Sequence, residues 1–160
     1  MMKNKIKSAP ALKKIIISLK RRGKRIVFTN GCFDILHKGH IELFKKAKSL
    51  GDVLIVAINS DRSVRKIKGP KRPINTAKDR AFILSAIELI DFITIFEEVE
   101  PGRIIKELNP DVLVKGGDWK RKEIVGKNFV ESKGGEVYSI PLIKGCSTSR
   151  LIEIIAKRFK

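Results

Sequence analysis

The chain contains only two histidines, His37 and His40, and Gly39 lies between them. An apolar run at residues 26–28 precedes them and predicts a short buried strand, while the amphipathic run at residues 41–50 predicts a helix. The first amides of a helix have no intrahelical partner and carry partial positive charge, so this junction is suited to binding phosphate. Gly39 has no β-carbon, which would let a ligand approach the backbone closely.

The histidine pair has three interpretations. The rings could be structural or surface groups, they could bind Zn²⁺ together with Cys32 or Asp34, or they could bind phosphate. Structural zinc sites usually have four protein ligands, and no Cys-x-x-Cys spacing is present. The neighbouring glycines and lysines and the predicted helix terminus favour phosphate recognition.

The composition indicates a globular chain with a strongly basic surface. Its 160 residues predict one domain with a real core, and 42% of them are hydrophobic, which argues against disorder. Lysine and arginine number 35 against 17 acidic residues, a net charge of +18. Aromatic residues make up only 6% and the basic residues are spread along the chain, so we expect a site for phosphorylated ligands and no specific nucleic-acid partner.

The sequence also predicts a cytoplasmic location. No apolar run approaches the roughly 20 residues that span a bilayer, and the basic residues 1–10 have no apolar core typical of a secretory signal. Two cysteines, Cys32 and Cys146, do not make a disulfide framework and are expected to stay reduced. Their spacing does not show whether the two thiols approach each other.

Apolar runs and turn residues predict alternating strands and helices. Residues 1–23 are expected to form a basic N-terminal helix, capped by Ser8, ahead of the main part of the domain at residues 24–160. The sequence Thr76-x-x-Asp79 resembles a capping box, and the basic residues 66–75 predict a mobile loop. Strands are expected at residues 26–29, 53–58, 92–96, 112–114 and 137–140, and helices at residues 9–22, 39–50, 76–89, 101–109 and 150–159, with a short helix after residues 59–61 and a weak one within residues 121–133.

This alternation predicts an α/β fold with a parallel, doubly wound sheet. Ligands of such sheets bind beyond the carboxyl ends of the strands. Three polar loops follow predicted strands, namely the histidine loop, residues 115–119 and residues 145–149. We therefore expect these loops to converge on one edge of the sheet.

The motifs at these loops resemble a known superfamily. The sequence His37-x-Gly39-His40 follows Gly31-Cys32-Phe33-Asp34, and Cys146-Ser147-Thr148-Ser149 precedes a terminal helix, as in cytidylyltransferase-like nucleotidyltransferases. From about residue 20 onward, the chain is similar to the adenylyltransferases of ADP-heptose synthesis. That closer resemblance rests on Asn59-Ser60-Asp61, Lys68-Gly69, Arg72-Pro73, Lys115-Gly116-Gly117-Asp118 and Gly145-Cys146-Ser147-Thr148.

The resemblance implies a Rossmann-like sheet of five strands in the order 3-2-1-4-5, with helices on both faces. It also implies that ATP and D-glycero-β-D-manno-heptose 1-phosphate react to give ADP-heptose and pyrophosphate for lipopolysaccharide or another surface glycan. The attacking phosphate is already ionised, so catalysis would reduce to positioning and charge stabilisation. The alternative is a related enzyme, such as a glycerol-3-phosphate cytidylyltransferase or another sugar- or polyol-phosphate nucleotidyltransferase.

Relatives are often dimers, and in many bacteria the adenylyltransferase is fused behind a sugar kinase. Only about 20 residues precede the matching region here, so we expect the heptose-phosphate kinase to be a separate chain. We also expect a homodimer, although no stretch of the sequence identifies an interface. The sequence does not decide which sugar phosphate is the acceptor or which anomer it is.

The resemblance assigns roles to individual residues. His37, His40 and Lys68 would be catalytic, and Mg²⁺ would arrive with ATP and be held mostly by its phosphates. Asp34 would either assist that metal or brace the loop, and Arg80 would contact phosphate or be a helix surface charge. Nucleotide-binding residues would be the two histidines together with Gly31, Cys32, Phe33, Gly39, Asp118, Gly145, Ser147 (also a candidate N-cap) and Thr148, and acceptor-phosphate residues would be Lys66, Arg80 and Lys115.

Overall fold

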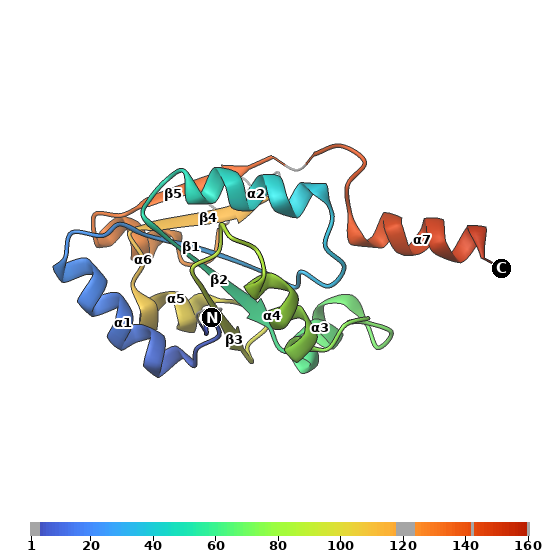
Figure 1. Ribbon diagram of the computed structural model, residues 1–160, viewed down its shortest axis with the longest axis horizontal. Coiled ribbons are helices and arrows are strands. Elements are labelled where there is room, and N and C mark those ends of the chain that lie inside the picture. The colour runs from blue at the N-terminus through green and yellow to red at the C-terminus, as the bar shows by residue number, and fades with distance from the viewer. Residues whose placement is uncertain (1–3, 118–123, 142, 160) are drawn as a thin grey trace.

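The computed structural model describes residues 4–117, 124–141 and 143–159. Five strands form one parallel sheet in the order β3-β2-β1-β4-β5 (Figure 1). The expected Rossmann-like α/β class and strand order are therefore confirmed. The strands are β1 (Ile26–Gly31), β2 (Val53–Asn59), β3 (Phe92–Phe96), β4 (Val112–Gly116) and β5 (Glu136–Ile140).

Helices cover both faces of the sheet. Apolar side chains of α1, α5 and α6 pack in a core cluster on one face, and those of α2 and α4 pack in a second cluster on the other (Figure 1). No helix in the described ranges is long and apolar enough to cross a bilayer. The helices are α1 (Ala9–Arg21), α2 (Lys38–Lys48), α3 (Asp61–Lys68), α4 (Ala77–Ser85), α5 (Gly102–Leu108), α6 (Lys127–Ser132) and α7 (Thr148–Arg158).

The central strands are buried on both faces because the helices sandwich them. All seven residues of β2 are buried, as its continuous apolar run predicts. Along β1, Val27 belongs to the cluster under α2 and α4, whereas Phe28 belongs to the cluster under α1 and α5. Successive side chains of a strand point to opposite faces, so this rigid sheet holds its carboxyl-end loops at defined positions.

Several predicted boundaries differ from the structure. Thr76 caps α4 by accepting a hydrogen bond from the Asp79 amide, as predicted, but Ser8 makes no side-chain cap. The predicted mobile loop at residues 66–75 was wrong in its first part, because α3 continues to Lys68 and ends at Gly69. The next helix, α4, ends four residues earlier than predicted, at Ser85.

Candidate active site at the carboxyl edge of the sheet

Loops that are distant in sequence meet beyond the carboxyl ends of β1, β4 and β5. A β-carbon placed on Gly39 would lie 3.3 Å from the β-carbon of Cys146, so the loop after β5 packs against the first turn of α2. The Thr148 hydroxyl donates a hydrogen bond to the carbonyl oxygen of Ile35 at 3.1 Å. The charge of Lys115, on β4, acts on the Cys32 thiol. The predicted convergence of the histidine loop with the loop before α7 is therefore confirmed, whereas residues 118 and 119 of the third predicted loop lie outside the described residues.

The two histidines form a stacked pair at the start of α2. His37 is the N-cap, and its Nδ1 accepts a hydrogen bond from the Gly39 amide at 3.1 Å. Because Nδ1 of the neutral ring accepts, the proton lies on Nε2, which can donate to a ligand. The two imidazole centroids are 3.8 Å apart, and the Phe33 ring meets the edge of His40 with its centroid at 5.1 Å. Stacking and the N-cap bond thus orient both rings.

Both imidazoles are neutral at pH 7. Burial lowers the pKa of His40 to about 4, with a further contribution from the neighbouring His37 ring, and burial also lowers the pKa of His37. The Nδ1 atom of His40 is buried and has no hydrogen-bond partner within the described residues. A neutral N–H group donates a hydrogen bond without carrying a full charge. These rings are therefore suited to stabilising negative charge that develops during a reaction.

The low pKa of His40 predicts a loss of stability in mild acid. The unfolded chain takes up this proton near pH 6.5 and the folded chain only near pH 4, so between these values the unfolded state binds more protons. We therefore expect the melting temperature to fall as the pH drops from 6.5 to 4. Melting curves of the wild type and the His40→Gln variant check this, because glutamine does not titrate. Equal pH slopes for the two proteins would contradict it.

Close backbone packing explains the glycines of the histidine loop. A β-carbon on Gly39 would lie 3.0 Å from ring atoms of His37, and one on Gly31 would lie 3.0 Å from the Phe33 ring. Phe33 itself has a φ of 45°, in the left-handed region that non-glycine residues rarely adopt. Such conformations concentrate at functional sites, where the surrounding contacts hold them.

Asp34 braces the histidine loop through bonds to the segment before α4. Its fully buried carboxylate accepts hydrogen bonds from Arg72 Nε at 2.6 Å and from the amides of Ile74 and Asn75, each at 2.8 Å. Burial alone would raise the pKa of Asp34, but these hydrogen bonds outweigh it and hold that pKa below its usual value. With its oxygens occupied in this way, Asp34 fits the bracing role and not that of a magnesium ligand.

Arg80 lies behind the site loops and is completely buried. Its Nη1 donates to the Cys32 carbonyl at 2.6 Å, and its Nη2 donates to the Asn59 carbonyl and to Asp61 Oδ1, both at 2.8 Å. Its Nε donates to the Asn75 carbonyl at 3.0 Å. This burial rules out the alternative of a helix surface charge, and the four bonds join the ends of β1 and β2 to the loop before α4.

Two lysines lie at the Cys32 end of the site. The charges of Lys68 and Lys115 both act on the Cys32 thiol, and burial lowers the pKa of Lys115. Lys66 belongs to the same helix as Lys68, and two residues along an α-helix correspond to a rotation of about 200°, so the two lysines face opposite sides. Asp118 lies outside the described residues.

The start of α7 supplies the last part of the site. Ser147 is its N-cap, and the Ser147 Oγ accepts a hydrogen bond from the Arg150 amide at 3.1 Å. Gly145 has a φ of +80°, which favours glycine and turns the chain toward the helix. This cap uses the Arg150 amide, so the amides available to an anion are those that precede it in the first turn of α7.

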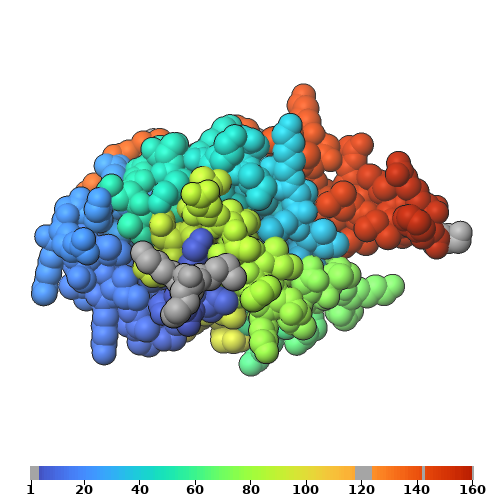
Figure 2. Space-filling model, viewed as in Figure 1, coloured from blue at the N-terminus to red at the C-terminus, as the bar shows by residue number. Residues whose placement is uncertain are grey.

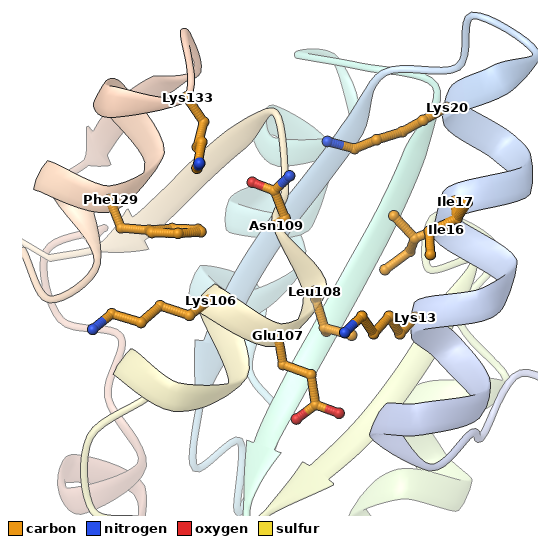
Figure 3. Close-up of a pocket in the computed structure, with 10 residues that line it drawn as sticks. All are labelled: Lys13, Ile16, Ile17, Lys20, Lys106, Glu107, Leu108, Asn109, Phe129 and Lys133. Carbon is orange, nitrogen blue, oxygen red and sulfur yellow. The ribbon is translucent and has the colours of Figure 1, made fainter.

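A separate hollow of about 390 Å³ lies between α1, α5 and α6, on the other face of the sheet from α2 (Figure 3). Lysine side chains surround an apolar floor formed by Ile16, Leu108 and Phe129 (Figure 3). No residue predicted for the site lines this hollow, so the carboxyl edge is the better candidate for chemistry.

The sequence profile of the cytidylyltransferase-like family matches residues 28–154. The chain belongs to this family. The match begins in β1 and ends in α7, so it includes the histidine pair, both lysines and the loop before α7. The region that matches the family therefore contains all the described residues of the candidate site.

Curated relatives align with this chain over nearly its whole length. It is 50% identical to the bifunctional protein HldE of Geobacter metallireducens over 155 residues, which are 97% of this chain and 32% of that protein. The corresponding HldE of Syntrophotalea carbinolica is 46% identical over 157 residues, 98% of this chain and 32% of that protein. The chain thus spans about a third of the length of these curated relatives.

Two solved structures share the fold. The crystal structure of the lipopolysaccharide core biosynthesis protein from Thermoplasma volcanium has 30% identity and a TM-score of 0.63, over 78% of this chain and 100% of that one. A pantoate–β-alanine ligase from Francisella tularensis also has a TM-score of 0.63, over 96% and 79% of the two chains. At 19% identity, the ligase supports the fold alone.

Proposed function

We propose that this protein transfers AMP from ATP to D-glycero-β-D-manno-heptose 1-phosphate, with release of pyrophosphate and formation of ADP-heptose. The observation that carries the proposal is the stacked, neutral pair of His37 and His40 at the start of α2, in contact with the loop before α7. The motif resemblance and the similarity to a lipopolysaccharide core biosynthesis protein favour the sugar acceptor.

In the proposed reaction an oxygen of the acceptor phosphate attacks the α-phosphorus of ATP, and the bond between that phosphorus and the bridging oxygen to the β-phosphate breaks. The attacking phosphate is ionised at neutral pH, so no side chain has to remove a proton. The Nε2–H of His37 and the ring of His40 would donate to the triphosphate where negative charge builds up. The amides at the start of α7 would hold the β- and γ-phosphates, with Ser147 and Thr148 shaping that turn.

Cations around Cys32 would position the second phosphate. Lys68 and Lys115 approach this end of the site from α3 and β4, and a pair of ammonium groups offsets repulsion between two phosphorylated substrates. The backbone at Gly31, Cys32 and Phe33 would lie against the nucleotide. Lys66 faces away from Lys68 on α3 and has at most a peripheral role.

Magnesium enters this proposal as part of the ATP substrate. Within the described residues, no group of three or more histidine, cysteine or acidic side chains could hold a metal ion. The Asp34 carboxylate is taken up by Arg72 and two backbone amides. Mg²⁺ would therefore be held by phosphate oxygens and retained water, which suits its preference for oxygen ligands.

The test is a pyrophosphate-release assay with a panel of ATP and CTP against heptose 1-phosphate and glycerol 3-phosphate. We expect release that requires both ATP and heptose 1-phosphate. A reaction of CTP with glycerol 3-phosphate in preference would replace this proposal with the cytidylyltransferase alternative. No release that depends on heptose 1-phosphate would reject the acceptor.

The acceptor implies a preceding reaction. We propose that a heptose-phosphate kinase acts earlier on the same sugar, and that this activity lies outside the 160 residues, in the same cytoplasmic compartment. Both cysteines are free, in keeping with a reducing compartment.

A further inference from the structure

The guanidinium of Arg150 folds back over the turn that leads into α7. A β-carbon placed on Gly145 would lie 3.3 Å from Arg150 Nη1 and 3.8 Å from its Cζ, so the side chain lies against the backbone of the preceding loop. From this turn α7 extends to one end of the molecule (Figure 1; red in Figure 2). The charge of Arg150 is thus placed at the start of its own helix.

The same turn contacts the histidine loop on its other side. A β-carbon on Gly39 would lie 3.3 Å from the β-carbon of Cys146 and 3.0 Å from ring atoms of His37. Two residues along an α-helix correspond to a rotation of about 200°, so Arg150 leaves the helix opposite Thr148, whose hydroxyl bonds to the histidine loop. The turn before α7 therefore lies between the histidine pair and the Arg150 guanidinium.

Arg150 has no ion pair with any acidic side chain of the described residues. The single acid of α7, Glu153, lies three residues further along the helix and is not paired with it. The Arg150 side chain is also exposed, so a ligand can reach it. Its guanidinium is therefore available to an anion, in contrast to the four arginines that each pair with a carboxylate, namely Arg25, Arg72, Arg80 and Arg103.

We propose that Arg150 binds the terminal phosphates of ATP, which leave as pyrophosphate. A planar guanidinium presents paired N–H donors that match phosphate oxygens, and it stays charged at every physiological pH. The first-turn amides of α7 that precede the Arg150 amide would donate to the same phosphates. The inference rests on the proposed function, because that function places the triphosphate at this turn.

Arg150 and the histidines would then act on different parts of the substrate. The two imidazoles are neutral and would stabilise charge that develops during the reaction, whereas Arg150 would offset the full charge of the leaving group. A contact with the terminal phosphates distinguishes ATP from AMP and does not distinguish one base from another. Loss of Arg150 should therefore weaken binding of ATP and of pyrophosphate, but not of AMP.

Isothermal titration calorimetry of the full chain with ATP, pyrophosphate and AMP tests this inference, each with Mg²⁺ and at about 0.15 M salt. We expect Arg150→Met to raise the Kd for ATP and for pyrophosphate by roughly tenfold, as the loss of a hydrogen bond to a charged group does. The Kd for AMP should stay at the wild-type value. Arg150→Lys should recover part of the affinity, because lysine keeps the charge without the paired donors.

Arg158→Met is the matched control. Arg158 is an exposed arginine of the same helix, about 12 Å from Arg150 along the helix axis, so this variant makes the same change in charge away from the turn. Its three Kd values should equal those of the wild type, and circular dichroism checks that each variant is folded.

Two results would overturn the inference. One is an unchanged Kd for ATP and pyrophosphate in Arg150→Met. The other is an equal rise in the Kd for AMP, because that would show that Arg150 only holds the start of α7 in place. In the steady-state assay, the KM for ATP should rise in Arg150→Met while the KM for the sugar acceptor stays unchanged.

The binding measurements need no sugar acceptor, so the inference and the proposed function can fail separately. A wild type that binds ATP through Arg150 but releases no pyrophosphate with heptose 1-phosphate would reject the proposed acceptor and leave the role of Arg150 standing. A wild type that binds neither ATP nor pyrophosphate would overturn both.

Discussion

Replacement of His40 or His37 by alanine is expected to lower kcat roughly 100- to 1,000-fold, by analogy with the loss of one donor that stabilises transition-state charge. Each neutral ring would donate to the triphosphate, and the two rings stack at 3.8 Å, so loss of one also removes a contact that orients the other. Steady-state pyrophosphate release at saturating ATP and acceptor measures the effect.

Lys38→Ala is the matched control, because Lys38 lies between the histidines but is exposed. Its kcat should stay close to that of the wild type. Thermal melting at pH 7.5 separates rate from stability, since the alanine variants should remain folded at the assay temperature. Wild-type turnover in both histidine variants would rule out the assigned roles.

Arg80→Met is expected to destabilise the fold by about 3–5 kcal/mol, as removal of one member of a buried ionic network does. The substitution leaves the carbonyls of Cys32, Asn59 and Asn75 without their donor and the Asp61 carboxylate without its cation. Urea unfolding followed by circular dichroism measures the change.

Arg62→Met provides the comparison, because Arg62 is an exposed arginine of neighbouring α3 and its loss should change stability little. Arg80→Lys should recover only part of the stability, since one ammonium group cannot reach all four acceptors. An Arg80→Met protein with wild-type stability but no activity would instead indicate direct contact with substrate phosphate.

Much of the fold could be predicted from the sequence because its strands are short, apolar and separated by helices. The uninterrupted apolar run of β2 predicts a central strand covered on both faces, and it is the buried neighbour of β1 in the sheet. Thr76 predicts the start of α4 correctly, because its cap depends on neighbouring residues alone. The convergence of site loops follows from the parallel direction of the strands.

The roles of the buried charges could not be predicted in this way. Arg80 is 48 residues from Cys32 in sequence, and Arg72 is 38 residues from Asp34, so each bond depends on the folded sheet. Neither Asn59 nor Asp61 had a predicted role, although both were part of the motif resemblance. The sequence showed only that these two residues are polar and directly follow the apolar run of a predicted strand.

The error at residues 66–75 has a local cause. Gly69 and Pro70 predicted a loop from Lys66 onward, but the Ser60 hydroxyl caps α3 by accepting a hydrogen bond from the Ser63 amide, and the helix continues to Lys68. A helix that ends at Lys68 brings this lysine, and not Lys66, toward Cys32.

The hydrogen bond between Thr148 and Ile35 joins the loop after β1 to α7, which follows all five described strands in the sequence. During synthesis on the ribosome, all five strands emerge before α7 does. A nascent chain can therefore assemble its sheet before the proposed nucleotide site is complete. Under the proposed function, nucleotide binding then has to wait until α7 has left the ribosome.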